Sequence, residues 1–169
     1  NFLAELMKQE VVEIYDGLIE IRGVARDPGS KAKVAVYSKD NINNLVGICV
    51  GPRGSKIQAV SSELRGEKID VIEWSEDRAE FTANLLSPAN VSKVIVNDLT
   101  GITDVVVPQD QFNLAIGRSG QNIKLVQRII GGKINILTEE EEKEKMSIYI
   151  AVETLEYLKK GGRISAGTA

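Results

Sequence analysis

The stretch Val46–Val60, VGICVGPRGSKIQAV, predicts an apolar helix, the four-residue turn Gly51–Gly54 and a second helix. The same layout returns 66 positions later in Gln111–Val126, QFNLAIGRSGQNIKLV, around the turn Gly117–Gly120. A single Gly-x-x-Gly carries little information, because glycine is common. Two copies between apolar segments, each with Ile shortly after its second glycine, predict a duplicated structural unit.

Outward from each turn, hydrophobic periodicity predicts the same order of elements twice: helix, strand, strand, helix, turn, helix, strand. In the first copy the helices are expected at 2–11, 42–50 and 55–64, and the strands at 18–24, 33–37 and 68–74. In the second copy the helices are expected at 76–86, 111–116 and 122–130, and the strands at 91–96, 103–107 and 133–137. Asp40 and Asp110 are predicted to cap the helices that lead into the turns.

With 169 residues the chain has room for two small domains. We expect an α+β fold of two layers, in which a three-stranded sheet packs on helices in each of residues 1–75 and 76–138. Residues 139–169 lack the repeat. They predict an acidic linker, then an amphipathic helix over 148–158 and a flexible tail over 161–169.

Composition excludes several kinds of function. The chain has no histidine, which removes the commonest general base and metal ligand, so we expect no enzyme activity, metal or cofactor. Its one cysteine, Cys49, lies in an apolar run and is expected to be a buried thiol in a reducing compartment. No apolar run approaches 18 residues, so we expect a soluble cytoplasmic protein without membrane contact. Because the chain begins with Asn1, we expect a fragment of a longer protein.

The net charge of −3 hides an uneven distribution. Between Gly117 and Ile136 there is no acidic residue, but there are four cations: Arg118, Lys124, Arg128 and Lys133. The first copy has Arg53, Lys56, Arg65 and Lys68 against Glu63 and Glu67, while Glu139–Glu142 concentrates negative charge elsewhere. The field near each turn matters more for ligand binding than the total charge.

A turn with glycine at both ends lets its backbone approach a ligand, and the following helix points its free N–H groups at the same place. This arrangement suits a phosphate, and apolar residues just before the turn suit the bases of single-stranded RNA. The residues expected to bind RNA are Gly51, Pro52, Arg53, Gly54, Ser55 and Lys56, and Gly117, Arg118, Ser119, Gly120, Gln121, Asn122 and Lys124. The expected groove floor is Ile48, Val50, Leu114 and Ile116.

A tight helix–turn–helix in a protein core explains one Gly-x-x-Gly equally well. The arginine inside each turn, Arg53 or Arg118, favours binding, because arginine is costly to bury and the turn does not need it. For Ile48 and Leu114, a place in the core is at least as plausible as a place on the groove floor.

The element order with its Gly-x-x-Gly resembles the prokaryotic (type II) KH domain, twice in tandem. Longer stretches resemble the KH region of bacterial transcription elongation and termination factors. They are 13–21, 23–36, 50–55, 64–70, 73–77 and 114–122. Those factors usually have proline where this chain has Val12.

The resemblance implies two KH domains packed as one rigid unit that binds an extended nascent transcript, antiterminator sequences included. It also implies RNA polymerase as a partner, contacted through parts of the full-length factor that this chain lacks. Two other hypotheses stay open: a nucleotide-binding enzyme, which the absence of Gly-x-x-x-x-Gly-Lys and of histidine disfavours, and a ribosomal KH protein or protein-docking scaffold.

Overall fold

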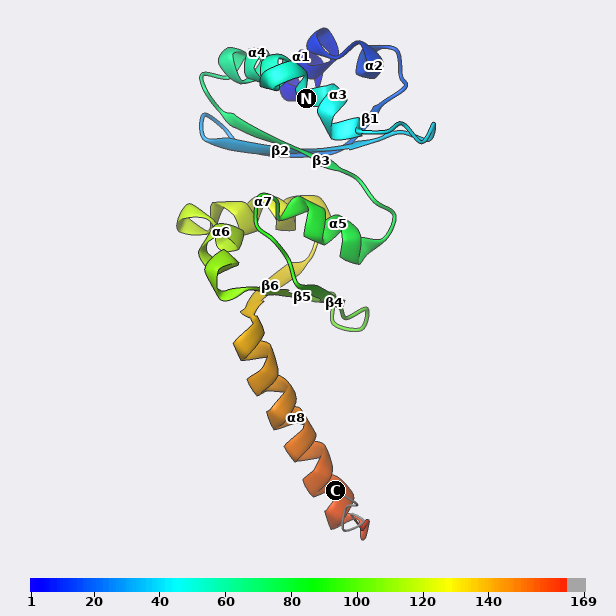
Figure 1. Cartoon of the computed structure of the whole chain (residues 1–169), viewed down its shortest axis with the longest axis vertical. Helices are drawn as coiled ribbons and strands as arrows, with labels where there is room; N and C mark the ends of the chain where they lie inside the picture. Colours follow the sequence, from blue (N-terminus) through cyan, green and yellow to red (C-terminus); the bar gives the residue numbers. More distant parts are fainter. Residues whose placement is uncertain (164–169) are drawn as a thin grey trace.

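A computed structural model describes residues 1–163 and shows helices and sheets in alternating layers, from which one long helix extends (Figure 1). The first layer is the helices of the N-terminal unit, followed by its sheet, then the helices of the second unit and its sheet. Within residues 1–163 we find no helix that is both long and apolar enough to cross a membrane.

The first unit has a three-stranded sheet in the order β1-β2-β3, with β1 and β2 antiparallel and β2 and β3 parallel. Its strands are β1 (Glu20–Asp27), β2 (Lys31–Tyr37) and β3 (Lys68–Glu73). Its helices are α1 (Phe2–Glu10), α2 (Val12–Tyr15), α3 (Leu45–Val50) and α4 (Ser55–Glu63).

The second unit repeats this topology, with sheet order β4-β5-β6 and the same strand directions. Its strands are β4 (Lys93–Val96), β5 (Ile102–Val107) and β6 (Lys133–Thr138). Its helices are α5 (Arg78–Leu85), α6 (Phe112–Ile116) and α7 (Gln121–Ile130). The predicted α+β class with two tandem units of this order is confirmed.

Several local predictions are wrong. The first helix ends at Glu10 because Val11 is extended, and the short α2, which the periodicity does not predict, follows it. Asp40 caps nothing, since α3 begins only at Leu45 after Asn44 in the left-handed region. Asp110 lies in a 3₁₀ turn before α6, whose N-cap is Gln111 without a side-chain hydrogen bond. These errors share a cause: one local cap signal does not fix where an irregular connection ends.

The acidic linker is also wrong, because Glu139–Lys159 form one helix, α8. The hydroxyl of Thr138 accepts a hydrogen bond from the N–H of Glu141, and the run of glutamates occupies the first turn, where negative charge stabilises a helix. The expected amphipathic segment 148–158 is helical, but apolar residues lie on more than one side of it and none is buried. The predicted tail falls mostly at 164–169, outside the described residues.

The first sheet is buried on both faces, since every residue from Ala32 to Val36 in β2 is buried. Ala32, Val34 and Val36 face the core formed with the helices of the first unit. Ala35 and Ile72 belong instead to the core of the second unit. Alternation along a strand places successive side chains on opposite faces, so α5 and α7 cover the face that α1–α4 do not.

Close contact between the units depends on Gly23 in β1. A Cβ at this position would lie 3.1 Å from Cγ2 of Ile129 in α7. The missing side chain therefore lets α7 lie directly against the sheet.

A polar cluster lies in this interface. The Lys33 ammonium is fully buried and donates to Oδ2 of Asp70 at 3.1 Å and to the carbonyl of Ser87, in the second unit, at 2.9 Å. Lys31 bridges the units in the same way, to Asp70 at 3.3 Å and to Oδ1 of Asn122 at 3.1 Å. Burial lowers the pKa of Lys33 to about 8 despite the nearby Asp70 carboxylate.

A second buried carboxylate holds the β1–β2 hairpin. Glu67, which is fully buried, accepts two hydrogen bonds of 2.9 Å from the Arg26 guanidinium and one of 2.9 Å from the N–H of Gly29. The hydrogen bond from Arg26 keeps the pKa of Glu67 below its ordinary value. The hairpin turn is thereby fixed to the loop between α4 and β3.

Cys49 is fully buried in the first core, and burial raises the pKa of its thiol to about 11. The prediction of a buried thiol is confirmed.

Lys33→Met tests the interface cluster through pH. The native Lys33 releases its proton near pH 8, whereas the unfolded chain holds it to about 10.5, so unfolded molecules bind more protons between these values. The stability of the unmodified chain should therefore rise relative to Lys33→Met between pH 8 and 10, by about 1–3 kcal/mol. Urea unfolding of both proteins across this range measures the difference, and a constant difference would contradict the burial of a charged Lys33.

Glu67→Gln should destabilise the chain by about 2–3 kcal/mol at pH 7, because it leaves the partly buried Arg26 without its carboxylate. Since the pKa of Glu67 is lowered by folding, this difference is expected above the unfolded pKa of about 4.5 and should shrink below it. The exposed Glu63 on α4 provides the control Glu63→Gln, for which we expect a change within about 0.5 kcal/mol.

Candidate nucleic-acid interface

The two Gly-x-x-Gly turns adopt the same backbone conformation. Gly51 has φ 81° and ψ 170°, and Gly117 has φ 79° and ψ 170°. The third position is left-handed in both, with φ 54° at Arg53 and 56° at Ser119, and the closing glycines Gly54 and Gly120 have φ 73° and 74°. Two sequences that share only their glycines thus form one structure.

The first glycine of each turn is needed for packing. A Cβ at Gly51 would lie 2.6 Å from Cγ of Lys56, and a Cβ at Gly117 would lie 2.7 Å from the backbone nitrogen of Asn122. Real Cβ atoms do not approach other atoms this closely. The following helix can therefore fold back over the turn only because these positions have no side chain.

The second glycine faces open space. A Cβ at Gly54 would have no neighbour within 4 Å, and one at Gly120 would meet only the end of Lys124 at 3.7 Å and Ile123 at 4.0 Å. Neither glycine is required by packing inside the protein. The open side of the turn is therefore where a ligand can lie against the backbone.

Each turn leads directly into a helix of at least nine residues, α4 or α7. Within residues 1–163, no side chain accepts a hydrogen bond from the backbone at the start of either helix. The unpaired N–H groups and the positive end of the helix dipole are therefore directed at the open side of the turn. This is a suitable environment for an anion.

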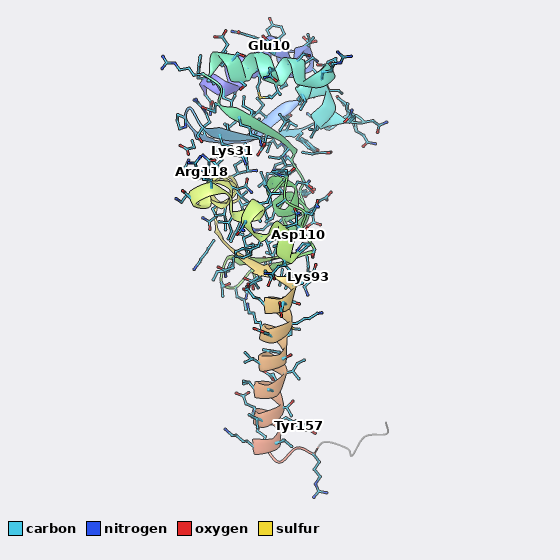
Figure 2. All side chains as sticks on the ribbon, turned by 60° about the vertical axis from the view of Figure 1, so that its left-hand side comes forward. Glu10, Lys31, Lys93, Asp110, Arg118 and Tyr157 are labelled. Carbon is cyan, nitrogen blue, oxygen red and sulfur yellow. The ribbon has the colours of Figure 1, made fainter. Side chains whose placement is uncertain are left out.

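The two arginines occupy different positions. Arg53 is the third residue of its turn and Arg118 the second of its own, so the counterpart of Arg118 is Pro52, and that of Arg53 is Ser119. Both side chains are exposed. Figure 2 shows Arg118 at the boundary between the units, on the same side as Lys31.

Two of the predicted contact residues hold the turn instead. Asn122 is 1 % exposed, and its amide donates to the carbonyls of Ala115 at 2.9 Å and Leu86 at 3.4 Å. Its expected contact with RNA is therefore wrong for the side chain. Lys56, at the equivalent position, donates to the carbonyl of Ile48 at 3.1 Å, and Lys124 donates to the carbonyl of Ser119 at 3.3 Å.

The second turn also contacts the first unit. Nε2 of Gln121 donates to Oδ2 of Asp27 and to Oγ of Ser30, both at 2.7 Å. Arg128, further along α7, donates to the carbonyl of Arg26 at 2.8 Å. The hairpin of the first unit thereby fixes the position of the second turn.

A cavity of about 300 Å³ lies at this junction. Its lining residues are Asp27, Ser30, Arg118, Ser119, Gln121 and Lys124. Sequence reasoning missed Asp27 and Ser30, because they were assigned only to a hairpin turn about 90 residues before the glycines they adjoin. No local pattern signals that contact.

The predicted groove floor is divided. Ile48 packs against the first core, whereas its counterpart Leu114 is 45 % exposed. Val50 and Ile116 are half-buried beside their turns. The remaining predicted residues, Pro52 and Ser55, are exposed at the first turn.

Within residues 1–163 no three histidine, cysteine or acidic side chains are placed to hold a metal ion. The arrangement offers backbone N–H groups and cations for an anionic polymer, and half-buried apolar side chains beside them.

Comparison with known proteins agrees with this fold. Residues 1–74 match the model of the NusA-like first KH domain, and residues 78–144 match that of the NusA-like second KH domain. The crystal structure of APE1850 covers 78 % of this chain and 96 % of its own, with a TM-score of 0.55 and 18 % identity, which shows similarity of fold alone.

Curated relatives named transcription termination/antitermination protein NusA are 47 % identical in Halalkalibacterium halodurans and Bacillus subtilis, over 85 % and 88 % of this chain. The relative from Rickettsia prowazekii is 45 % identical over 86 %. The chain spans 38 %, 40 % and 29 % of these three relatives. Neither matched domain is an enzyme domain. The chain therefore belongs to the NusA-like family and contains its first and second KH domains in tandem.

Proposed function

We propose that this chain binds single-stranded RNA, with one phosphate group at the start of α4 and another at the start of α7. The observation that carries the proposal is the identical backbone of two turns whose closing glycines, Gly54 and Gly120, face open space. Backbone N–H groups bind the phosphate, and Arg53 and Arg118 add positive charge beside it.

The two units act as one binding surface. Lys31, Gln121 and Arg128 cross the interface through hydrogen bonds, so the distance between the turns is fixed before RNA arrives. A preformed pair of sites does not have to be ordered during binding, which favours affinity. An extended strand is the ligand that meets both sites, because its phosphates and bases are separately accessible.

We infer the biological context from the relatives, which are transcription termination/antitermination proteins. The RNA is then a nascent transcript in the cytoplasm. RNA polymerase is contacted by parts of the longer proteins that lie outside this chain. The KH modules are taken as residues 1–75 and 76–138.

Gly54→Asp and Gly120→Asp place a negative side chain on the open side of each turn. Aspartate tolerates the left-handed conformation better than most residues, and neither position has a neighbour to displace, so the fold should survive. We expect each variant to bind single-stranded RNA at least about tenfold more weakly, and the double variant not to bind. Fluorescence anisotropy with an RNA selected by the unmodified chain measures the affinity.

Matched controls lie at the other ends of the same helices. Gly66 and Gly131 also have positive φ, 83° and 75°, and a Cβ at either position would have no neighbouring atom within 4 Å. Gly66→Asp and Gly131→Asp therefore introduce the same charge and the same strain. Equal loss of binding in these variants, or unchanged binding in the turn variants, would refute the phosphate sites.

Arg118→Gln should reduce the dependence of affinity on salt. The logarithm of the binding constant falls with the logarithm of salt concentration by about 0.7 for each phosphate neutralised on a single strand. Loss of one such contact should lower the slope by about that amount, with the loss of affinity similar across RNA sequences. Arg65→Gln, beyond the far end of α4, should leave the slope unchanged.

A further inference from the structure

Helix α8 is joined to the second unit only through its first part. Oγ of Ser92 donates to Glu139 at 2.7 Å, Lys93 pairs with Glu142, and Lys145 pairs with Asp104 at 3.0 Å. These contacts fix the direction in which the helix leaves the outer face of β4-β5-β6. Beyond them the helix projects away from both units, with Tyr157 near its far end (Figures 1 and 2).

The outer face of this sheet corresponds to the face of the first sheet that α5 and α7 cover. Lys33 and Asp70 are paired across the first sheet, and Asp104 and Asn135 take the equivalent places in the second. Lys145 of α8 supplies the cation there. A cavity of about 240 Å³ remains where α8 leaves the sheet, bounded mainly by Ile95, Leu137, Met146 and Tyr149. Met146 and Tyr149 thus mark the side of α8 that faces its own unit.

Another side of α8 carries an uncovered apolar stripe, which we define as Ile148, Ala151, Val152 and Leu155. Spacings of three and four residues place these side chains on one face of the helix. Ile148 is 66 % exposed, Val152 is 48 % exposed and Leu155 is 58 % exposed. Monomeric proteins rarely leave a continuous apolar surface open, so the stripe has the character of an interface.

The charges of α8 identify what covers the stripe. Its start carries Glu139–Glu142 and Glu144, whereas its end is followed or formed by Lys159, Lys160 and Arg163. A parallel copy of the helix would place acid beside acid and base beside base. An antiparallel copy places the acidic start of each helix beside the basic end of the other.

One antiparallel register satisfies both patterns. With the two-fold axis at Ile150, Ile148 meets Val152 of the partner subunit, and the stem of Lys145 meets the partner's Leu155. Glu141 then meets the partner's Lys159, and the small Ala151 lies near the axis, where the two helices approach each other. These positions follow the alternating three- and four-residue spacing of a coiled-coil seam, which runs along the helix from Glu141 to Lys159.

We propose that this chain self-associates through α8, which pairs antiparallel with α8 of a second copy. The arrangement places the two KH pairs at opposite ends of a two-helix rod. Each dimer then presents four Gly-x-x-Gly turns, two at each end, so a long RNA or two RNAs can be held at once. The pairing does not depend on RNA binding.

Charge reversals in the full chain, followed by sedimentation equilibrium without RNA, test the pairing. Glu141→Lys and Lys159→Glu should each weaken the dimer by about tenfold, because either change converts two attractive contacts into repulsive ones. The double variant should regain the affinity of the unmodified chain. An equimolar mixture of the two single variants should form a heterodimer more stable than either homodimer.

These rescues separate pairing from helix stability. Both substitutions oppose the helix dipole, so an effect on the helix alone would be largest in the double variant. Lys143→Glu and Glu153→Lys reverse charge on the opposite side of α8 and should leave the dimer unchanged. A chain that is monomeric at all concentrations, or a dimer indifferent to the reversals at Glu141 and Lys159, would overturn the proposal. So would single variants whose mixing restores nothing.

Discussion

The structure depends on the burial of both faces of the first sheet. Its central strand, β2, is apolar on one face, and on the other it alternates alanine with lysine, so neither solvent nor a second apolar layer alone suits it. The helices α5 and α7 cover that face, and Asp70, Ser87 and Asn122 satisfy the two lysines. Apolar burial holds the units together, while the polar contacts require one relative position, because a buried ammonium without partners is far more costly than a misplaced methyl group.

This constraint reaches the candidate binding surface through short connections. Asn122 both receives Lys31 and packs over Gly117, so the same side chain belongs to the interface and to the turn. Gln121, one residue earlier, contacts the hairpin that Glu67 and Arg26 hold in place. The second turn is therefore a product of two units. The first turn is closed within its own unit by Lys56, which explains why the two turns share a backbone but differ in their neighbours.

Helix α8 extends the logic of the repeat. In each unit the outer face of the sheet meets a helix from the next part of the chain, through α7 in one case and α8 in the other. The two helices differ in outcome, because α7 returns to its own sheet through β6, whereas α8 continues outward and exposes apolar side chains along most of its length. A helix of this composition needs a partner surface, and its charges are ordered so that a second copy supplies one.

The sequence by itself determined the order of elements, the α+β class, the duplication and the two turns, because each rests on local properties: the period of apolar residues, and glycines at positions with positive φ. It also determined that Cys49 is buried. Tertiary structure alone decided that Asn122 is interior, that Lys33 lies between the units, and that Asp27 and Ser30 adjoin a turn far along the chain. It also decided that the acidic segment begins a helix. These features depend on which surfaces meet after folding, and such meetings leave no periodic signal in the residues that take part.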